Sequence, residues 1–401
     1  MDAYLSESHR KLRSQIREFA EGEIAPVARE LDETGRFPWE NVRKMADLGL
    51  FGVNVPKEYG GLGLDYLSYI VVIEELARVD ASHAITVSAH STLGSSPILN
   101  FGDEAQKRRY LPLLATGRVL AGFGLTEPGA GSDSAGTRTV ATRVNGGYRI
   151  TGSKIFITHA GVGEVFVVTA VTDRSAGARG ITSFIVTKET TDREAAERVG
   201  VGHAPELEPF TPGVRAGKKE DKMGWRASDT RELILEDAEV PVENRLGAEG
   251  EGFINFMKTL DSGRIGIGAL ALGIAQGALD CILAAAPDAR LRDSQGAQFT
   301  LADLATEITA ARHLVYHAAW LRERGEPYGR AAAMAKLYAS ELSVRAASTA
   351  IQLLGERGLL DEYPVERMLR DAKICEIGEG TSEIQRLVIA RHLLREAGVA
   401  S

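Results

Sequence analysis

The sequence predicts a multidomain α+β protein in which two helical regions flank a β-rich middle region. Apolar residues recur at helical spacing in the first and last thirds of the chain, whereas they alternate as in strands between them. A chain of 401 residues also exceeds what one hydrophobic core usually supports. We therefore expect an N-terminal all-α domain over residues 1–118, a middle antiparallel β domain over 119–243 and a C-terminal helical bundle over 244–401.

The first domain opens with an apolar stripe from Leu12 to Ile24, which indicates a helix. Pro26, Gly52 and the glycine-rich turn at residues 60–63 interrupt the helical pattern. Between these breaks, further helices are expected at residues 39–50, 65–79 and 103–114.

The middle domain is predicted from segments rich in β-branched and aromatic residues, separated by turn residues such as those at 145–147. Strands are expected at residues 148–158, 164–171, 181–186 and 232–235. The stretch 188–213 is charged, contains prolines and shows no clear period. It is expected to be an inserted surface loop rather than another strand.

The last domain returns to long helical segments, expected at residues 253–286, 301–324, 331–354 and 385–395. Helices of this length joined by short turns favour an antiparallel bundle.

Composition excludes several classes of function. The net charge of −8 is spread without a basic stripe, which argues against a nucleic-acid partner. The two cysteines form no CxxC pair and the eight histidines no HExxH, so no metal site is expected. No apolar run approaches the ~20 residues that cross a bilayer, and no targeting signal is evident, so a cytoplasmic protein without a membrane span is expected.

Two short stretches hold residues suited to chemistry. Glu379 stands between Gly378 and Gly380 just ahead of the last helix, where the bare backbone lets a ligand approach the carboxylate. Ser382 and Gln385 have the spacing of a capping box for that helix. The loop at residues 125–136 combines hydroxyls and glycines, and its backbone N–H groups suit a phosphate or a polar ring edge.

Five motifs in order carry a resemblance to a known family: residues 125–136, Phe-Ile-Thr at 156–158, and residues 217–224, 260–264 and 377–386. Through them the chain resembles the acyl-CoA dehydrogenases, closest to the short-chain (butyryl-type) branch, over nearly its whole length. The resemblance implies an α domain, a β domain and a C-terminal four-helix bundle, in agreement with the periodicity.

The resemblance also implies FAD between the β domain and the bundle, with an acyl-CoA beside it. The residues implied to bind FAD are Phe123, Leu125, Thr126, Gly131, Ser132, Phe156, Ile157, Thr158, Gln295, Gln352, Gly355, Thr381, Ser382 and Glu383. Those implied to contact the substrate are Ser132, Asp261, Ser262, Gly263, Arg264 and Gly380. Glu379 matches the catalytic base of the family.

The implied reaction is the α,β-dehydrogenation of a saturated short- to medium-chain or branched acyl-CoA. Glu379 would remove the α-proton while the β-hydrogen moves as hydride to flavin N5, giving a trans-2-enoyl-CoA. We expect desolvation by the ligand to raise the pKa of Glu379. Electrons would pass to an electron-transfer flavoprotein, as in fatty-acid β-oxidation, and the protein would be a homo-oligomer, either tetramer or dimer.

Three other functions remain open on the same residues: an acyl-CoA oxidase, a biosynthetic dehydrogenase of acyl-carrier-protein thioesters, and a non-catalytic acyl-CoA-binding paralogue. Oxygen uptake would reveal the first and preference for a protein-bound acyl group the second. The intact motif residues, Glu379, Thr126, Thr158 and Arg264, oppose the third.

Four departures from the family pattern bear on these expectations. Phe156 replaces the usual Trp, and Gly378 replaces the Tyr before the base, which predicts a roomier acyl site. Residues 282–290 are about five residues short and lack the Arg-x-x-Phe-Gly-x-Pro element that reaches FAD of a neighbouring subunit in relatives. Arg290 or Arg292 is a candidate substitute. Glu356 replaces a glycine beside the FAD diphosphate, where its charge would repel phosphate unless it turned to solvent or Arg357.

Overall fold

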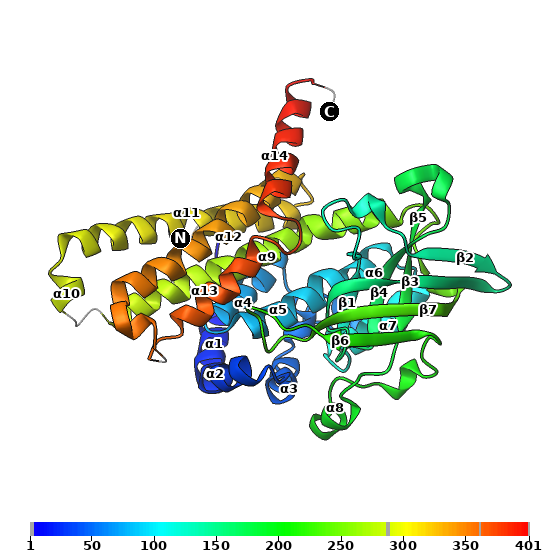
Figure 1. Cartoon of the computed structure of the whole chain (residues 1–401), viewed down its shortest axis with the longest axis horizontal. Helices are drawn as coiled ribbons and strands as arrows, with labels where there is room; N and C mark the ends of the chain where they lie inside the picture. Colours follow the sequence, from blue (N-terminus) through cyan, green and yellow to red (C-terminus); the bar gives the residue numbers. More distant parts are fainter. Residues whose placement is uncertain (1–3, 286–288, 361, 400–401) are drawn as a thin grey trace.

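The computed structural model describes residues 4–285, 289–360 and 362–399, and its elements follow the order helices, sheet, helices. In Figure 1 the sheet lies at one end of the molecule and the long C-terminal helices at the other, with α4 and α5 between them. The last helix, α14, projects away from the rest. This arrangement confirms the predicted α+β fold.

The N-terminal helices begin at side-chain caps that the sequence supplies. Asp65 accepts a hydrogen bond from the backbone of Ser68 at the start of α4, and Asp103 forms a capping box with Gln106 at the start of α7. The elements are α1 (Glu7–Phe19), the π-helical η1 (Ala20–Ile24), α2 (Ala25–Thr34), α3 (Trp39–Asp47), the short 3₁₀ turns η2 (Leu50–Gly52) and η3 (Lys57–Tyr59), α4 (Tyr66–Ala77), α5 (Ala81–Ser88), the π-helical η4 (Ala89–Ser95), α6 (Ser96–Phe101) and α7 (Glu104–Ala115).

The middle domain is one eight-stranded sheet with the strand order β6-β7-β3-β2-β4-β5-β8, to which β1 is added beside β4. The strands are β1 (Ala121–Gly124), β2 (Val140–Val144), β3 (Gly147–Thr158), β4 (Val165–Val171), β5 (Ile181–Thr187), β6 (Val214–Lys219), β7 (Thr230–Pro241) and β8 (Arg245–Leu246). Most pairs are antiparallel, as predicted, whereas β1 and β2 each run parallel to β4.

The inserted stretch 188–213 contains no strand, as predicted, but it is not merely a solvated loop. It forms the helix α8 (Arg193–Val199) and the turn η7 (Pro205–Leu207), and Ala196 and Leu207 are fully buried. A Cβ built at Gly202 would lie 2.2 Å from the ring of Trp39, and the Trp39 indole donates to Asp192. The insertion therefore packs the sheet domain against α3.

The C-terminal region consists of α9 (Gly252–Ala284), α10 (Ala289–Arg292), α11 (Gln295–Glu323), α12 (Gly329–Leu354), the 3₁₀ turn η9 (Gly355–Gly358), α13 (Val365–Cys375) and α14 (Ser382–Glu396). The four predicted helices are present, although α11 begins six residues earlier than expected. Helix α13, whose buried side includes Val365, Met368 and Cys375, is not among the predicted helices.

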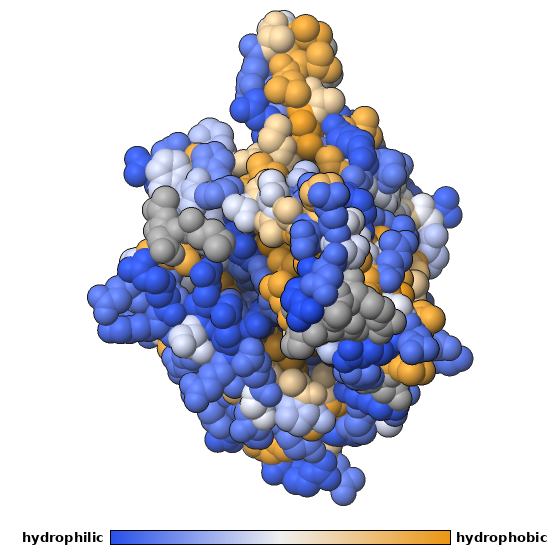
Figure 2. All heavy atoms as spheres, turned by 90° about the vertical axis from the view of Figure 1, so that its left-hand side faces the viewer, coloured by the Kyte–Doolittle hydropathy of each residue, from blue (hydrophilic) through white to orange (hydrophobic). Residues whose placement is uncertain are grey.

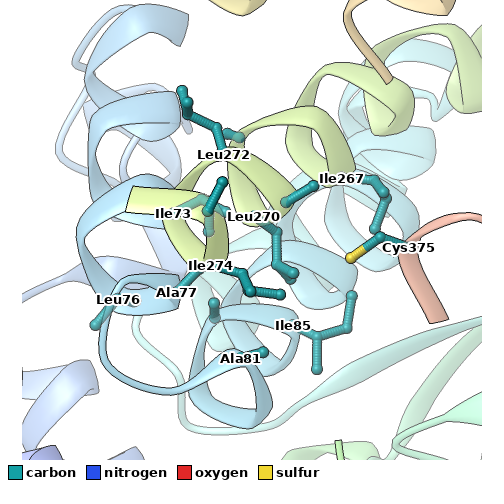
Figure 3. Close-up of a cluster of buried hydrophobic side chains, with 14 of the residues drawn as sticks. Ile73, Leu76, Ala77, Ala81, Ile85, Ile267, Leu270, Leu272, Ile274 and Cys375 are labelled. Atoms are coloured by element: carbon teal, nitrogen blue, oxygen red, sulfur yellow. The ribbon is translucent and has the colours of Figure 1, made fainter. Parts of the chain in front are cut away.

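Helices from both ends of the chain share one hydrophobic core (Figure 3). Two glycines of α9 bring it close to α4, because a Cβ at Gly273 would lie 2.4 Å from the carbonyl oxygen of Glu74, and one at Gly277 would lie 2.2 Å from that of Arg78. Ile73 of α4, Ile85 of α5 and Leu270 of α9 meet in this core. Helix α9 is thereby fixed between the N-terminal helices and the bundle.

Helix α9 is the segment that bears on the expected absence of a membrane-spanning helix. By length and composition alone it is the one such helix in the described ranges, with a mean hydropathy of 1.8 over its most apolar window. However, 72% of that window is buried within the protein. Burial of this extent is the behaviour of a central core helix.

Candidate active site

Glu379 lies in the turn between α13 and α14, and its backbone has a φ of 53°. A positive φ is uncommon for a residue with a side chain and is often found at functional sites. The side chain points at α9, since a Cβ built at Gly263 would lie only 2.1 Å from Glu379 Oε2. Glycine at 263 is therefore what makes room for the carboxylate.

The carboxylate of Glu379 is desolvated and unpaired. Both of its oxygens are buried, and neither has a hydrogen-bond partner among the described residues. This burial raises the pKa of Glu379 to about 7, although the charges of Lys336 and Arg264 act to lower it. We expected desolvation by the ligand to raise this pKa, and the fold already raises it through burial by the protein.

Hydrogen bonds from two side chains and from the backbone hold the turn that carries Glu379. Lys336 Nζ and Gln385 Nε2 both donate to the carbonyl oxygen of Gly380, at 2.7 and 2.8 Å. The backbone N–H of Ser382 donates to the carbonyl oxygen of Glu376 at 2.9 Å. Gly380 itself has a φ of 94°, a conformation that favours glycine.

The expected capping box at α14 is wrong. Thr381, not Ser382, is the N-cap residue, and its hydroxyl accepts from the backbone of Ile384. Gln385 is buried and binds the Glu379 turn instead of the helix start. The Ser382 hydroxyl is buried without a partner among the described residues, so it is available to a ligand at the helix N-terminus.

The predicted substrate residues 261–264 form one turn of α9 facing Glu379. Arg264 is buried and donates to Asp261 at 2.5 Å, which leaves its charge beside the base. Ser262 points elsewhere, because its hydroxyl donates to Thr259 and its carbonyl accepts from Tyr66. The structure thus brings Gly263 and Arg264 to the carboxylate, whereas the Ser262 side chain bonds within its own helix.

The predicted flavin loop follows β1 and is anchored by a buried acid. Glu127 accepts hydrogen bonds from Thr139 at 2.6 Å, from Lys154 at 2.6 Å and from Thr137. The contact with Lys154 and the hydroxyl donors hold the pKa of Glu127 down at about 2 despite its burial. Around this anchor Leu125 is buried and Thr126 half-buried, whereas Gly131 and Ser132 are exposed.

The Phe156-Ile157-Thr158 motif lies at a bulge of β3 beside that loop. Ile155 donates its backbone N–H to the carbonyl of Thr126 at 2.8 Å, which joins the two predicted flavin segments. Phe156 has a φ of 57° and is 62% exposed. A large aromatic side chain held outward on a strained backbone indicates a surface that a planar ligand covers.

These two segments fit a bound flavin. No described atom lies within 4 Å of a Cβ built at Gly131, so the loop leaves open space there. Phe123 packs inward instead, stacked on Phe256 of α9 with ring centroids 4.0 Å apart. Strand β1 also packs on η4, whose Leu93 reaches within 3.4 Å of the Cβ position at Gly263. The flavin loop and Glu379 are therefore connected through Leu93 and α9.

The remaining predicted FAD residues lie at the other end of the bundle. Gln295 begins α11, Gln352 lies in the last turn of α12 and Gly355 follows that helix, and all three residues are exposed. Along α12, the 16 residues from Lys336 to Gln352 span about 24 Å. Within one chain this second group and the Glu379 turn do not converge on the same part of a ligand.

The structure shows what surrounds the residues that depart from the family pattern. A Cβ at Gly378 would meet only the carbonyl oxygen of Ile374, at 3.5 Å, so the position accepts a side chain. Glu356 is exposed, and Arg357 binds Glu362 and Tyr363. Arg292 pairs with Asp293, whereas the side chain of Arg290 lies outside the described part of the structure.

One lysine and two tyrosines beside Glu379 are not predicted from the sequence. Lys336 is fully buried in a face of α12 that is rich in alanines. Tyr66 and Tyr69 of α4 lie close enough to the carboxylate for its charge to raise their pKa values further. A single lysine within an alanine-rich buried stripe is a signal that the pattern of residues 332–339 contains. Among the described residues no cluster of potential metal ligands occurs.

Comparisons with known proteins agree with this architecture. Family models for the acyl-CoA dehydrogenase N-terminal, middle and C-terminal domains match residues 6–118, 122–238 and 250–394. The short-chain specific acyl-CoA dehydrogenase of Clostridium acetobutylicum is 46% identical over 98% of this chain and 100% of its own length. The structure of butyryl-CoA dehydrogenase from Megasphaera elsdenii superposes with a TM-score of 0.90 at 42% identity, covering 98% of this chain and all of that one.

Two other solved structures bear on cofactor and partner. A chain from the structure described as the electron transferring flavoprotein of Acidaminococcus fermentans superposes with a TM-score of 0.90 at 44% identity over 98% of this chain and 100% of that one. A glutaryl-CoA dehydrogenase from Mycobacterium smegmatis in complex with FADH2 is 28% identical, with a TM-score of 0.87 over 100% of this chain and 97% of that one.

Fold and site together define a flavin-dependent oxidoreductase that acts on a CH–CH bond. The chain belongs to the acyl-CoA dehydrogenase family. Its cofactor is FAD, and its reaction is the dehydrogenation of an acyl-CoA; several of its relatives are short-chain enzymes. The oxidase and carrier-protein alternatives are not favoured by these relatives.

Proposed function

We propose that Glu379 is the base that removes the α-proton of the acyl-CoA thioester, yielding a trans-2-enoyl-CoA. The supporting observation is its buried carboxylate, which has no partner among the described residues and a pKa raised to about 7. A base with this pKa is partly ionised at neutral pH and matched to proton abstraction. FAD, when bound, supplies the acceptor for the hydride from the β-carbon.

The flavin ring would be held by two segments of the sheet domain. Thr126, Gly131 and Ser132 supply hydroxyls and open backbone on one side, and Phe156 to Thr158 supply an aromatic face and a hydroxyl on the other. Thr381, Ser382 and Glu383 would meet the cofactor at the start of α14, where free N–H groups favour an anion. The geometry that supports this assignment is the hydrogen bond between Ile155 and Thr126.

The thioester would lie between Glu379 and α9. Gly263 leaves space for the carboxylate, and Arg264 and Lys336 provide positive charge around the reacting carbon. Positive charge there favours the enolate-like character that develops as the proton leaves. Asp261, Ser262 and Gly380 complete the predicted substrate contacts, together with Ser132 from the flavin loop.

A substrate panel tests this assignment. Purified protein carrying FAD should show a flavin absorption band that bleaches anaerobically with a short-chain acyl-CoA, and kcat/KM should rise with pH through an apparent pKa near 7. The same band in the Glu379→Gln variant should persist on adding substrate. Bleaching of that variant at the wild-type rate would refute Glu379 as the base.

We infer that the working enzyme is a homo-oligomer, a tetramer or a dimer. Along α12, Gln352 lies about 24 Å from Lys336, which bonds the Glu379 turn, so a second chain is the natural source of Gln295, Gln352 and Gly355 for each flavin. Helix α14 also exposes apolar side chains on the projection visible in Figure 2, including Leu387, Leu393 and Leu394. Light scattering measures the assembly, and a monomer that retains FAD on dilution would contradict this inference.

We further propose that an electron-transfer flavoprotein in the cytoplasm accepts the electrons. The likeness to a chain solved with the flavoprotein of Acidaminococcus fermentans supports the acceptor, and the bacterial relatives support the compartment. Turnover with a purified electron-transfer flavoprotein should exceed turnover with oxygen alone. Peroxide formed in step with product would instead indicate an oxidase.

A further inference from the structure

Lys336, on helix α12, donates a hydrogen bond to the turn that carries Glu379. None of the sequence motifs includes this lysine. Lys336 is one of the largest fully buried side chains described, and it lies on α12, 44 residues from its partner in the sequence. Burying a lysine is costly unless its charge and donors are satisfied. Desolvation accordingly lowers the pKa of Lys336 to about 8, so the group is still mostly protonated at neutral pH.

Lys336 bonds a backbone carbonyl rather than a carboxylate. Its Nζ donates to the carbonyl oxygen of Gly380 at 2.7 Å, and the same oxygen accepts from Gln385 Nε2 at 2.8 Å. Gln385 also donates to the carbonyl of Glu379 at 3.3 Å. Two donors from different helices therefore converge on the two peptide groups beside the base.

The conformation of Glu379 requires such a restraint. Its φ of 53° lies in the left-handed region, which typically persists only where surrounding contacts over-determine it. Without the bonds to Gly380, the turn between Gly378 and Thr381 would have two glycines next to a strained residue. The carboxylate would then lose its fixed position against Gly263.

We propose that Lys336 is a positioning residue for the dehydrogenation: it clamps the Gly380 carbonyl so that Glu379 keeps its left-handed conformation, and it holds a positive charge beside the Glu379 carboxylate. This inference rests on the proposed role of Glu379 as the base. Gln385 shares the clamp but carries no charge, so the two residues separate the mechanical effect from the electrostatic one.

The charged and titratable groups that face Glu379 come from three elements. Arg264 lies on α9, Lys336 on α12, and Tyr66 and Tyr69 on α4. Around Lys336, the other titratable and charged groups are Arg264 on α9 and, at the C-terminal end of α13, Glu376 and Cys375; burial raises the pKa of the Cys375 thiol and keeps it neutral. Of the two cations, Lys336 exerts the larger effect on the pKa of Glu379. Removing this charge should make the carboxylate harder to ionise.

The test compares three variants of the FAD-loaded enzyme by stopped-flow measurement of flavin bleaching across pH. Lys336→Met, which removes donor and charge, should lower the limiting rate at least about tenfold and raise its apparent pKa by about one unit. Gln385→Met should lower the limiting rate and leave the pKa unchanged. Lys336→Arg, which keeps the charge, should restore the wild-type pKa.

A second readout does not depend on turnover. Difference infrared titration of wild type against Glu379→Gln reports the carboxylate directly, and its midpoint should rise in Lys336→Met. Lys188→Met serves as a matched control, because Lys188 is also buried and bonds backbone carbonyls, but in the sheet domain. It should leave both midpoints unchanged. If Lys336→Met does not fold, Lys336→Gln, which keeps an N–H donor without the charge, should give the same alkaline shift.

The inference on Lys336 is overturned if the folded Lys336→Met or Lys336→Gln enzyme keeps the wild-type rate and midpoint, or if Lys188→Met shifts the midpoint equally. The proposed function fails on a different result, namely wild-type turnover by Glu379→Gln. An inactive Glu379→Gln together with an unaltered Lys336→Met would defeat only the inference on Lys336.

Discussion

Two buried glutamates of this enzyme each have a buried lysine nearby, yet their environments have opposite effects. Glu127 contacts Lys154 directly at 2.6 Å and accepts further bonds from Thr137 and Thr139, and its pKa falls to about 2. Glu379 makes no hydrogen bond within the described residues, because Lys336 bonds the Gly380 carbonyl instead, and its pKa rises to about 7.

The comparison shows that direct contact with a lysine and with hydroxyl donors, more than burial alone, separates an anchoring carboxylate from a reactive one. Burial disfavours ionisation at both sites. Only at Glu127 do direct donors outweigh it. Glu127 therefore fixes the loop that holds Thr126 and Ser132, whereas Glu379 remains free to take a proton from a ligand.

The largest expected effect is the loss of flavin reduction when the Glu379 carboxylate is neutralised. Glu379→Gln should lower the rate of flavin reduction by about 10²- to 10⁴-fold, because the amide cannot accept the α-proton. The variant should still bind FAD, since the flavin loop is untouched. Rapid-reaction spectroscopy measures the rate, and the absorbance ratio of flavin to protein provides the control.

Neutralising Glu127 should instead destabilise the protein around the flavin loop. Glu127→Gln leaves Lys154 buried without its counter-charge, which should lower the free energy of unfolding by about 3–5 kcal/mol and weaken FAD retention. Urea denaturation measures this change. The double variant Glu127→Gln/Lys154→Met should recover part of the loss. A change of less than about 1 kcal/mol in the single variant would show that the pair does not anchor the loop.

The contrast between the two sites also explains what the sequence can and cannot predict. Glu379 is recognisable because two glycines and a helix start are local features of its motif. The donors that determine its environment are not local in the sequence. Lys336 lies on another helix and donates to a backbone carbonyl, and a bond to the backbone cannot be predicted from a pair of complementary side chains. Gln385 is misassigned because Thr381 and Ser382 are adjacent residues that can both cap a helix.

The fold, too, is predictable where local patterns determine it and less so where contacts between distant segments do. Long helices and most strands, including β4, emerge from the residue pattern, whereas α5 is buried on all sides, shows no apolar face against a polar one and is not predicted. The parallel pairing of β1 with β4 joins segments that are distant in the sequence. Helix α8 is hidden because most of its residues are charged and only Ala196 is buried. The domain boundaries near residues 118 and 243 stay predictions.

The two glutamates should give opposite dependences of stability on pH. The folded pKa of Glu379, about 7, lies above its usual 4.5, so between these pH values the native state binds a proton that the unfolded state has lost. The free energy of unfolding therefore falls as pH rises from 4.5 to 7, by up to about 3 kcal/mol. Glu127, with a pKa of about 2, stabilises the fold above 4.5 and loses that contribution as pH falls through 2. Urea unfolding at pH 4.5 and 8 should show Glu379→Gln gaining about 2–3 kcal/mol relative to wild type over this range. An unchanged difference would mean that the carboxylate is hydrated.

The smallest expected effect concerns the space beside the reactive glutamate. The Glu127 carboxylate is surrounded by its donors, whereas Gly378 next to Glu379 leaves room, since a Cβ there would meet only one carbonyl oxygen at an ordinary 3.5 Å. Gly378→Tyr should therefore fold and fill part of the acyl site. We expect kcat/KM for longer or branched acyl-CoAs to fall about tenfold relative to butyryl-CoA.

Gly378→Ala is the matched control, because it restricts the backbone without reaching the acyl chain, and it should leave the chain-length preference of the wild type in place. Steady-state kinetics with a series of acyl-CoAs measures both variants. If Gly378→Tyr lowers kcat/KM equally for every chain length, the missing ring governs the position of Glu379 and not the shape of the pocket. The wild-type enzyme should accept branched chains that the tyrosine variant excludes, because the volume next to the base is the only part of the site that this substitution changes.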